Sequence, residues 1–122
     1  MTYLLLVHHD ENEWLSLTEA ERQAIMAEPM PEIERLTAAG KFLGGSPLHP
    51  ASAAATVRPG GGKPLVTDGP FAETREQVAG YCFLEAQDRD EAVAIAASFV
   101  TPSSRASIEV RAVVGFKAMA TH

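Results

Sequence analysis

The chain has 122 residues, of which 46% are apolar and 21% are charged. These values are ordinary for a globular protein and exclude a disordered chain, so we expect one domain over residues 1–122. The net charge is −6 and no run of Lys or Arg occurs. Nucleic-acid-binding proteins normally carry a basic face, so we expect no nucleic-acid partner.

The first seven residues are mainly apolar, but the run is too short for a signal peptide or a membrane span. No basic segment precedes it. We therefore expect a cytoplasmic protein without a membrane partner. The chain has a single cysteine, Cys82, which excludes an intrachain disulfide and a thiolate metal cluster.

The first predicted element is a strand over Tyr3–His9, which begins with five apolar residues. Such a run indicates a strand that is covered on both faces. Two helices cover only one face of a sheet, and monomers rarely expose a large apolar patch, so we expect a homodimer. Trp14 and Leu15 are expected in a loop that leads to a helix.

Helical signals occupy the stretch Thr18–Ala39. Thr18 and Glu21 have the spacing of a capping box, in which each side chain satisfies a backbone donor of the other residue. Pro29 and Pro31 each remove a backbone donor and clash with the preceding turn. The stretch is therefore predicted to form two helical pieces, or one kinked helix.

The rest of the chain alternates between strand and turn signals. Further strands are predicted at Lys41–Leu48, Ala53–Arg58, Pro64–Thr67, Ala79–Ala86 and Ser107–Val114. The glycine-rich stretch Pro59–Lys63 predicts a hairpin turn. Asp88 is expected to cap a helix with the buried stripe Ala92, Ile95, Ala96 and Phe99. This order predicts an α+β fold, a ferredoxin-like antiparallel sheet of four or five strands with two helical segments on one face.

Residues 68–76 read DGPFAETRE. This string resembles DGPFAETKE, the signature of the YCII-related (DGPF) family, with Arg75 where lysine is common. The segments AGKFLGG (39–45), TVR (56–58) and IEVR (108–111) are also similar to family segments, although Ala112 replaces the usual proline. The chain is identified by this resemblance as a member of the family. The resemblance implies a ferredoxin-like fold that dimerises into an α/β barrel.

The same resemblance implies two kinds of function. Some relatives are dehydrochlorinase-like or isomerase-like enzymes of small ring compounds, so we expect a small-molecule acid/base enzyme. The shorter branch of the family has a proposed His–Asp pair with its histidine in the first helix, but residues 27–31 here read AEPMP. Many DGPF proteins are encoded beside extracytoplasmic-function sigma factors. The alternative is therefore a ligand-sensing or regulatory module associated with such a sigma factor.

Asp68 and His9 are the candidate catalytic residues. Asp68 either bonds the backbone of its own turn or directs a carboxylate into a cleft as an acid or base. His8 and His9 end the first strand and point to opposite faces, so only one of them can face a given cleft. Their spacing does not suit zinc, and no dinucleotide fingerprint occurs, so we expect neither a metal nor an organic cofactor.

Arg58, Glu73 and Arg75 are the candidate substrate-binding residues. The guanidinium group of Arg58 is suited to orienting an anionic substrate. Glu73, Arg75 and Glu76 form one polar stretch, which we interpret as a solvated turn of helix. The alternative hypothesis is that Arg75 forms an ion pair with Asp68 or binds an anionic substrate.

Two further features concern strands. Glu109 and Arg111 share a face of the last strand and are expected to form ion pairs across strands or a polar lining inside a dimer barrel. Cys82 lies in a core strand and is expected to be inert packing.

Overall fold

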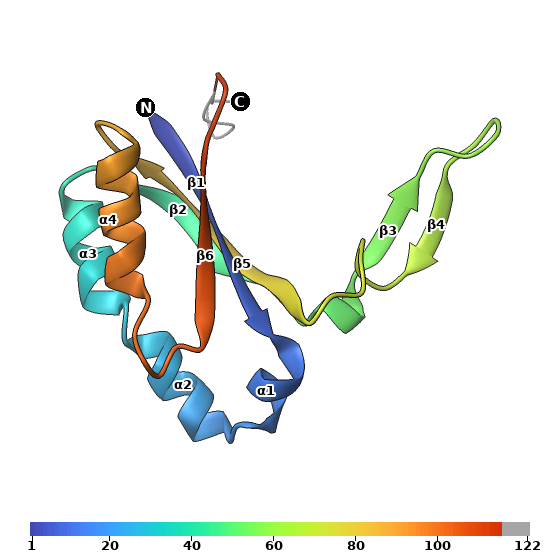
Figure 1. The fold of residues 1–122 in the computed structure, drawn as a ribbon, viewed down its shortest axis with the longest axis horizontal. Helices are drawn as coiled ribbons and strands as arrows, with labels where there is room; N and C mark the ends of the chain where they lie inside the picture. The colour runs from blue at the N-terminus through green and yellow to red at the C-terminus, as the bar shows by residue number, and fades with distance from the viewer. Residues whose placement is uncertain (116–122) are drawn as a thin grey trace.

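The computed structural model describes residues 1–115. Its elements are β1 (Thr2–Asp10), α1 (Glu11–Ser16), α2 (Glu19–Ala27), α3 (Met30–Ala38), β2 (Phe42–Pro47), the 3-10 helix η1 (Ala51–Ala53), β3 (Ala55–Arg58), β4 (Leu65–Asp68), β5 (Glu76–Glu85), α4 (Arg89–Phe99) and β6 (Ala106–Ala112). Four antiparallel strands form the main sheet in the order β2-β5-β1-β6, and α3 and α4 lie against one face (Figure 1). The predicted α+β class with an antiparallel sheet is confirmed, and the arrangement is compatible with a ferredoxin-like fold.

The hydrophobic core lies between the main sheet and the two helices. Tyr3 and Leu5 alternate along β1 with less buried neighbours, because successive strand residues point to opposite faces. Leu84 of β5, Leu36 of α3 and Ile95 of α4 complete the centre of this core. Within the described residues, no helix is long and apolar enough to cross a membrane.

The predicted division of the helical stretch is confirmed. The capping box of Thr18 and Glu21 starts α2, with both reciprocal hydrogen bonds present. The helix ends before Pro29, and α3 then begins with Pro31 in its first turn, where a missing backbone donor costs little.

The expectation of a loop at Trp14 and Leu15 is wrong, because α1 contains both residues. The helix starts directly after β1, since the Asp10 carboxylate accepts hydrogen bonds from the backbone N–H groups of Asn12 and Glu13 at 2.9 and 3.2 Å. An aspartate in this position satisfies donors that the first helical turn leaves open.

The helical interpretation of Glu73, Arg75 and Glu76 is also wrong. Glu73 and Arg75 lie in an irregular segment, and Glu76 already begins β5, three residues before the predicted start of that strand. The reason is the length of β1. Its last residues offer partners to the early part of β5, so that Asp10 is opposite Glu76.

Strands β3 and β4 form a separate two-stranded sheet, here called the arm (residues 55–68). The arm projects from the main sheet on the side opposite α3 and α4 (Figure 1). Its base is fixed by two hydrogen bonds, from Gly69 N to Ala54 O at 2.7 Å and from Thr56 Oγ1 to Gly69 O at 2.9 Å. The predicted hairpin is therefore confirmed, but it lies outside the main sheet.

Candidate functional site

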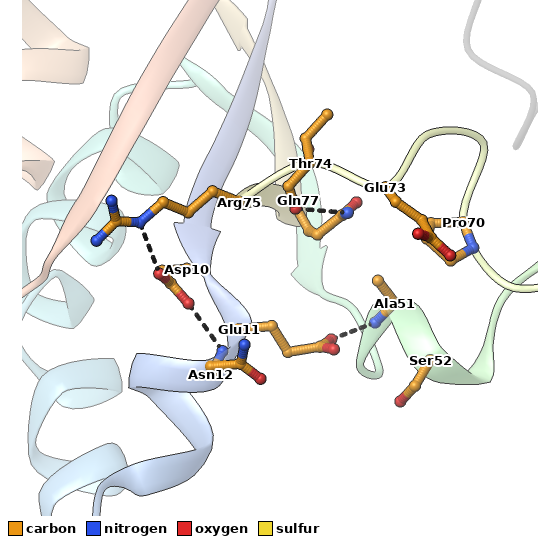
Figure 2. Close-up of a pocket in the computed structure, with 10 residues that line it drawn as sticks. All are labelled: Asp10, Glu11, Asn12, Ala51, Ser52, Pro70, Glu73, Thr74, Arg75 and Gln77. Carbon is orange, nitrogen blue, oxygen red and sulfur yellow. Dashed lines mark hydrogen bonds and ion pairs between the residues drawn. The ribbon is translucent and has the colours of Figure 1, made fainter.

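A cavity lies where the end of β1, η1 and the segment between the arm and β5 meet. Its volume is about 350 Å³. The lining residues are Asp10, Glu11, Asn12, Ala51, Ser52, Pro70, Glu73, Thr74, Arg75 and Gln77 (Figure 2). Three carboxylates and one guanidinium group thus share a cavity with amides and hydroxyls, a composition suited to a small polar molecule.

Asp10 connects the cavity to the start of α1. One carboxylate oxygen caps the helix, and the other, Oδ2, accepts from Arg75 Nε at 3.1 Å. The hydrogen bond from the Glu13 backbone, followed by the one from Arg75, lowers the pKa of Asp10. Asp10 therefore stays ionised and positions Arg75, rather than exchanging protons with a ligand.

Arg75 is bound through Nε alone among the described residues. Its side chain is 83% exposed, and its two terminal nitrogens make no hydrogen bond to any described group. A guanidinium group held at one edge in this way leaves the other donors available to an oxygen of a ligand.

Two hydrogen-bonded contacts fix the walls of the cavity. The backbone N–H of Ala51 donates to the Glu11 carboxylate, which ties η1 to the first turn of α1. The Gln77 side-chain amide donates to the carbonyls of Ala72 and Thr74, both at 3.0 Å. The second contact holds the loop that carries Glu73, so this loop has a defined conformation.

Glu73 is the lining carboxylate whose oxygens are not engaged. It makes no hydrogen bond or ion pair within residues 1–115, whereas both other lining carboxylates do. Figure 2 shows the Glu73 side chain beside Pro70, on the other side of the view from the Asp10–Arg75 pair. Among its charged groups, the cavity therefore presents a free carboxylate, Glu73, and the free terminal donors of Arg75.

Two of the predicted site residues, Glu73 and Arg75, line this cavity, and three do not. Asp68 is exposed at the base of the arm, and its carboxylate makes no hydrogen bond or ion pair with the described residues. The Arg58 guanidinium donates to Phe71 O at 2.9 Å and lies over the Phe71 ring, 5.2 Å from its centroid. The catalytic assignment of Asp68 and the binding assignment of Arg58 stay predictions.

The two histidines of β1 point to opposite faces, as expected. The His9 ring stacks on Trp14 with 5.2 Å between the ring centroids, whereas His8 Nε2 lies 3.1 Å from a carboxylate oxygen of Glu109. Burial lowers the pKa of His9, although the negative charges of Glu11 and Asp10 partly oppose this shift. His9 is therefore neutral at pH 7 and is placed beside α1 rather than in the cavity lining.

Asp10 and Gln77, which position Arg75 and the loop of Glu73, were among the site residues missed from the sequence. Asp10 precedes Glu13 by three positions directly after a strand, which is the spacing of a helix start and could have revealed its capping role. Gln77 has no such signal, because its importance depends on the folded loop. Arg75 pairs with Asp10 rather than with Asp68.

The residues that the structure describes contain no group of three or more His, Cys, Asp or Glu side chains arranged to hold a metal ion. Among the charged lining groups, the Glu73 carboxylate and the terminal nitrogens of Arg75 are free within residues 1–115, and both can bind an organic ligand.

Comparisons with known proteins identify related sequences. The model of the YCII-related domain matches residues 1–117. An uncharacterized protein of Rhizobium meliloti (strain 1021) is 33% identical over 118 residues, which cover 96% of this chain and 95% of that protein.

Proposed function

This chain belongs to the YCII-related domain family, and we propose that it binds a small polar ring compound in the cavity and acts on it by acid/base chemistry. Glu73 is the proton acceptor and Arg75 holds an oxygen of the substrate. The observation that carries the proposal is a free carboxylate, on a loop fixed by Gln77, in the same cavity as a guanidinium group fixed by Asp10.

Glu73 supplies the base and Arg75 supplies the hydrogen-bond donors for removal of a proton from a carbon next to a carbonyl group. Glu73 takes the proton from the C–H bond, and the electron pair of that bond moves toward the carbonyl oxygen. The terminal N–H groups of Arg75 donate to this oxygen as it gains negative charge. In a substrate with a carbon–carbon double bond at the β,γ position, return of the proton to the γ carbon moves the double bond into conjugation with the carbonyl group and isomerises the substrate, without a cofactor.

The ligand should therefore combine an oxygen acceptor for Arg75 with an acidic hydrogen for Glu73. The volume of about 350 Å³ suits a molecule of roughly one substituted ring, since cavities for drug-sized ligands begin near 300 Å³.

A thermal-shift screen of cyclic carbonyl compounds tests the binding step. We expect ligands that stabilise the wild type, with the shift lost in both Glu73→Gln and Arg75→Gln. Glu76→Gln is the matched control, because Glu76 lies outside the lining. Equal ligand shifts in wild type and Glu73→Gln would refute this site. A selective loss in Asp68→Asn would instead favour Asp68 as the principal group.

Proton transfer is tested separately with the ligands that bind. In D₂O, the wild type should exchange the hydrogen next to the carbonyl group of the ligand, as followed by proton NMR, and Glu73→Gln should not. Binding without exchange in the wild type would refute the enzymatic step and favour the ligand-sensing alternative.

A further inference from the structure

A second cavity lies between α3 and α4, the two helices that cover one face of the main sheet (Figure 1). Its volume is about 250 Å³, and it shares no lining residue with the cavity that contains Glu73 and Arg75. Leu36 of α3 and Ile95 of α4 give it an apolar wall. Both side chains belong to the hydrophobic core, so this wall is fixed by the packing beneath it.

Two ion pairs lie beside this apolar wall. On α3, Arg35 donates to the Glu32 carboxylate through Nε, at 3.1 Å, and through Nη2. Lys41, between α3 and β2, donates from Nζ to Glu91 Oε2 of α4 at 2.8 Å. All four charged side chains line the cavity, and their formal charges cancel. The kind of ligand that the cavity accepts therefore depends on which of these groups still have free hydrogen-bonding positions.

Every carboxylate oxygen of the two pairs already accepts a hydrogen bond. Both oxygens of Glu32 accept from Arg35. In Glu91, Oε2 accepts from Lys41 and Oε1 accepts from the backbone N–H of Gln87 at 2.8 Å. Hydrogen bonds from Arg35 and Lys41 are the main reason why the pKa values of Glu32 and Glu91 are lowered. Both carboxylates therefore stay ionised at neutral pH and hold the two cations in place.

The two cations, by contrast, retain free donors. Arg35 Nη1 makes no hydrogen bond within residues 1–115. In the same part of the chain, Lys41 donates one hydrogen bond, to Glu91, although an ammonium group has three donors. The side chains of Arg35 and Lys41 are 64% and 36% exposed, so a ligand can reach both from solvent. These donors match an oxyanion, because hydrogen bonds between ionised partners are about twice as strong as those between neutral ones.

We propose that the cavity between α3 and α4 binds a small organic carboxylate. The carboxylate accepts hydrogen bonds from Arg35 and Lys41, and the apolar body of the ligand lies against Leu36 and Ile95. Small-molecule sites typically combine an apolar lining with a few placed polar groups in this way. The site uses no residue of the first cavity, so it goes beyond the proposed acid/base function and does not depend on it.

Benzoate is a suitable probe, because it joins a carboxylate to one apolar ring. In proton–nitrogen NMR spectra of the full chain, added benzoate should cause saturable shifts at the amides of residues 35–41 and 91–98. Benzyl alcohol has the same ring without the charge and should bind at least about tenfold more weakly. Inorganic phosphate has no apolar body and should also bind more weakly. Equal binding of phosphate and benzoate would indicate a general anion site and would overturn the proposal.

Removal of either cation should weaken the binding of benzoate. Arg35→Gln and Lys41→Gln should each raise its Kd by about tenfold, because each removes a hydrogen bond between ionised partners. The matched controls are Arg89→Gln on α4 and Lys63→Gln in the turn of the arm. Both residues lie outside the lining of the cavity, so these variants should leave the Kd unchanged.

Replacement of a carboxylate should have the opposite effect. Glu32→Gln removes the negative charge beside Arg35 and should lower the benzoate Kd by roughly twofold or more. Glu34→Gln makes the same change on α3 outside the lining and should have no effect. If the pair of Glu32 and Arg35 only stabilised the fold, its disruption would not tighten the binding of an anion.

Four results would overturn the proposal. They are the absence of saturable shifts at these amides, an unchanged Kd in both cation variants, weaker or unchanged binding in Glu32→Gln, and loss of the shifts in Arg75→Gln. The last result would place the benzoate in the first cavity, whereas failure of the acid/base proposal alone leaves the shifts at α3 and α4 intact. Well-dispersed spectra establish that each variant is folded. If the variants do not fold, equal Kd values for benzoate and benzyl alcohol in the wild type would still refute the site.

Discussion

The replacement Leu84→Ala tests how the main sheet is stabilised. Leu84 lies in β5 and is fully buried, at 0% exposure. It is opposite Tyr3 of β1 on one side and Phe42 of β2 on the other, and it belongs to the core cluster under α3 and α4. Its side chain therefore holds three strands and the helical layer together.

The expected cost follows from this position. Loss of three buried carbon groups removes about 2.4 kcal/mol of transfer free energy. The strand is hydrogen-bonded along both edges, so its backbone cannot move to close the space, and the remaining cavity adds about 1 kcal/mol. We expect a destabilisation of about 3–4 kcal/mol, equivalent to a fall in Tm of roughly 10–15 °C.

The assay is urea and thermal unfolding followed by circular dichroism at one fixed protein concentration, because dimerisation would make Tm concentration-dependent. Leu65→Ala makes the same chemical change at a side chain that is 59% exposed on the arm. It should cost less than about 0.5 kcal/mol. The reasoning would be refuted if Leu84→Ala cost under about 1 kcal/mol, or if both replacements had equal effects.

Three further predictions concern ionisable side chains. Burial lowers the pKa of His9 below 6.5, so the unfolded chain binds the proton more readily, and the free energy of unfolding should fall as the pH drops through 6.5. An NMR titration should give a pKa below 6.5 that rises in Trp14→Ala, whereas a pKa above 6.5 in the wild type would contradict this. Hydrogen bonds also lower the pKa of Asp10, so this carboxylate stabilises the fold above pH 3.8, its ordinary pKa, and the contribution is lost as the pH falls below that value. Acid unfolding of Asp10→Asn should therefore be less steep than that of the wild type, and identical acid transitions would argue against this contribution. Burial raises the pKa of the Cys82 thiol to about 11, so Ellman's reagent at pH 8 should react slowly with the native protein and rapidly with the protein unfolded in guanidinium chloride. Fast reaction of the native thiol would show instead that it is accessible.

Much of the fold could be predicted from the sequence, because the deciding interactions are local. The alternation of Tyr3 and Leu5 with Leu4 and Leu6 follows from the geometry of a single strand. The capping box and the break at Pro29 depend on residues within one or two helical turns. The signature string at residues 68–76 contains Glu73 and Arg75, so this segment of the site could also be predicted from the sequence.

The composition of the cavity was decided by tertiary structure. Arg75 meets Asp10 across 65 residues of chain, and Glu11 meets Ala51 across 40. Neither pairing leaves a periodic or spacing signal, because each depends on how the end of β1, η1 and the start of β5 come together. The helical interpretation of Glu73–Glu76 failed for the same reason.

The arm shows which features the local sequence determines and which depend on tertiary structure. The turn at Pro59–Lys63 and the flanking strand signals predict a hairpin, since glycine-rich turns and β-prone residues act over a few positions. Whether that hairpin joins the main sheet depends on which strand edges are free. In this fold the arm pairs with neither free edge, β2 or β6, because hydrogen bonds at its base, from Gly69 N to Ala54 O and from Thr56 Oγ1 to Gly69 O, direct it away from the main sheet. Val57 and Val66 therefore stay exposed.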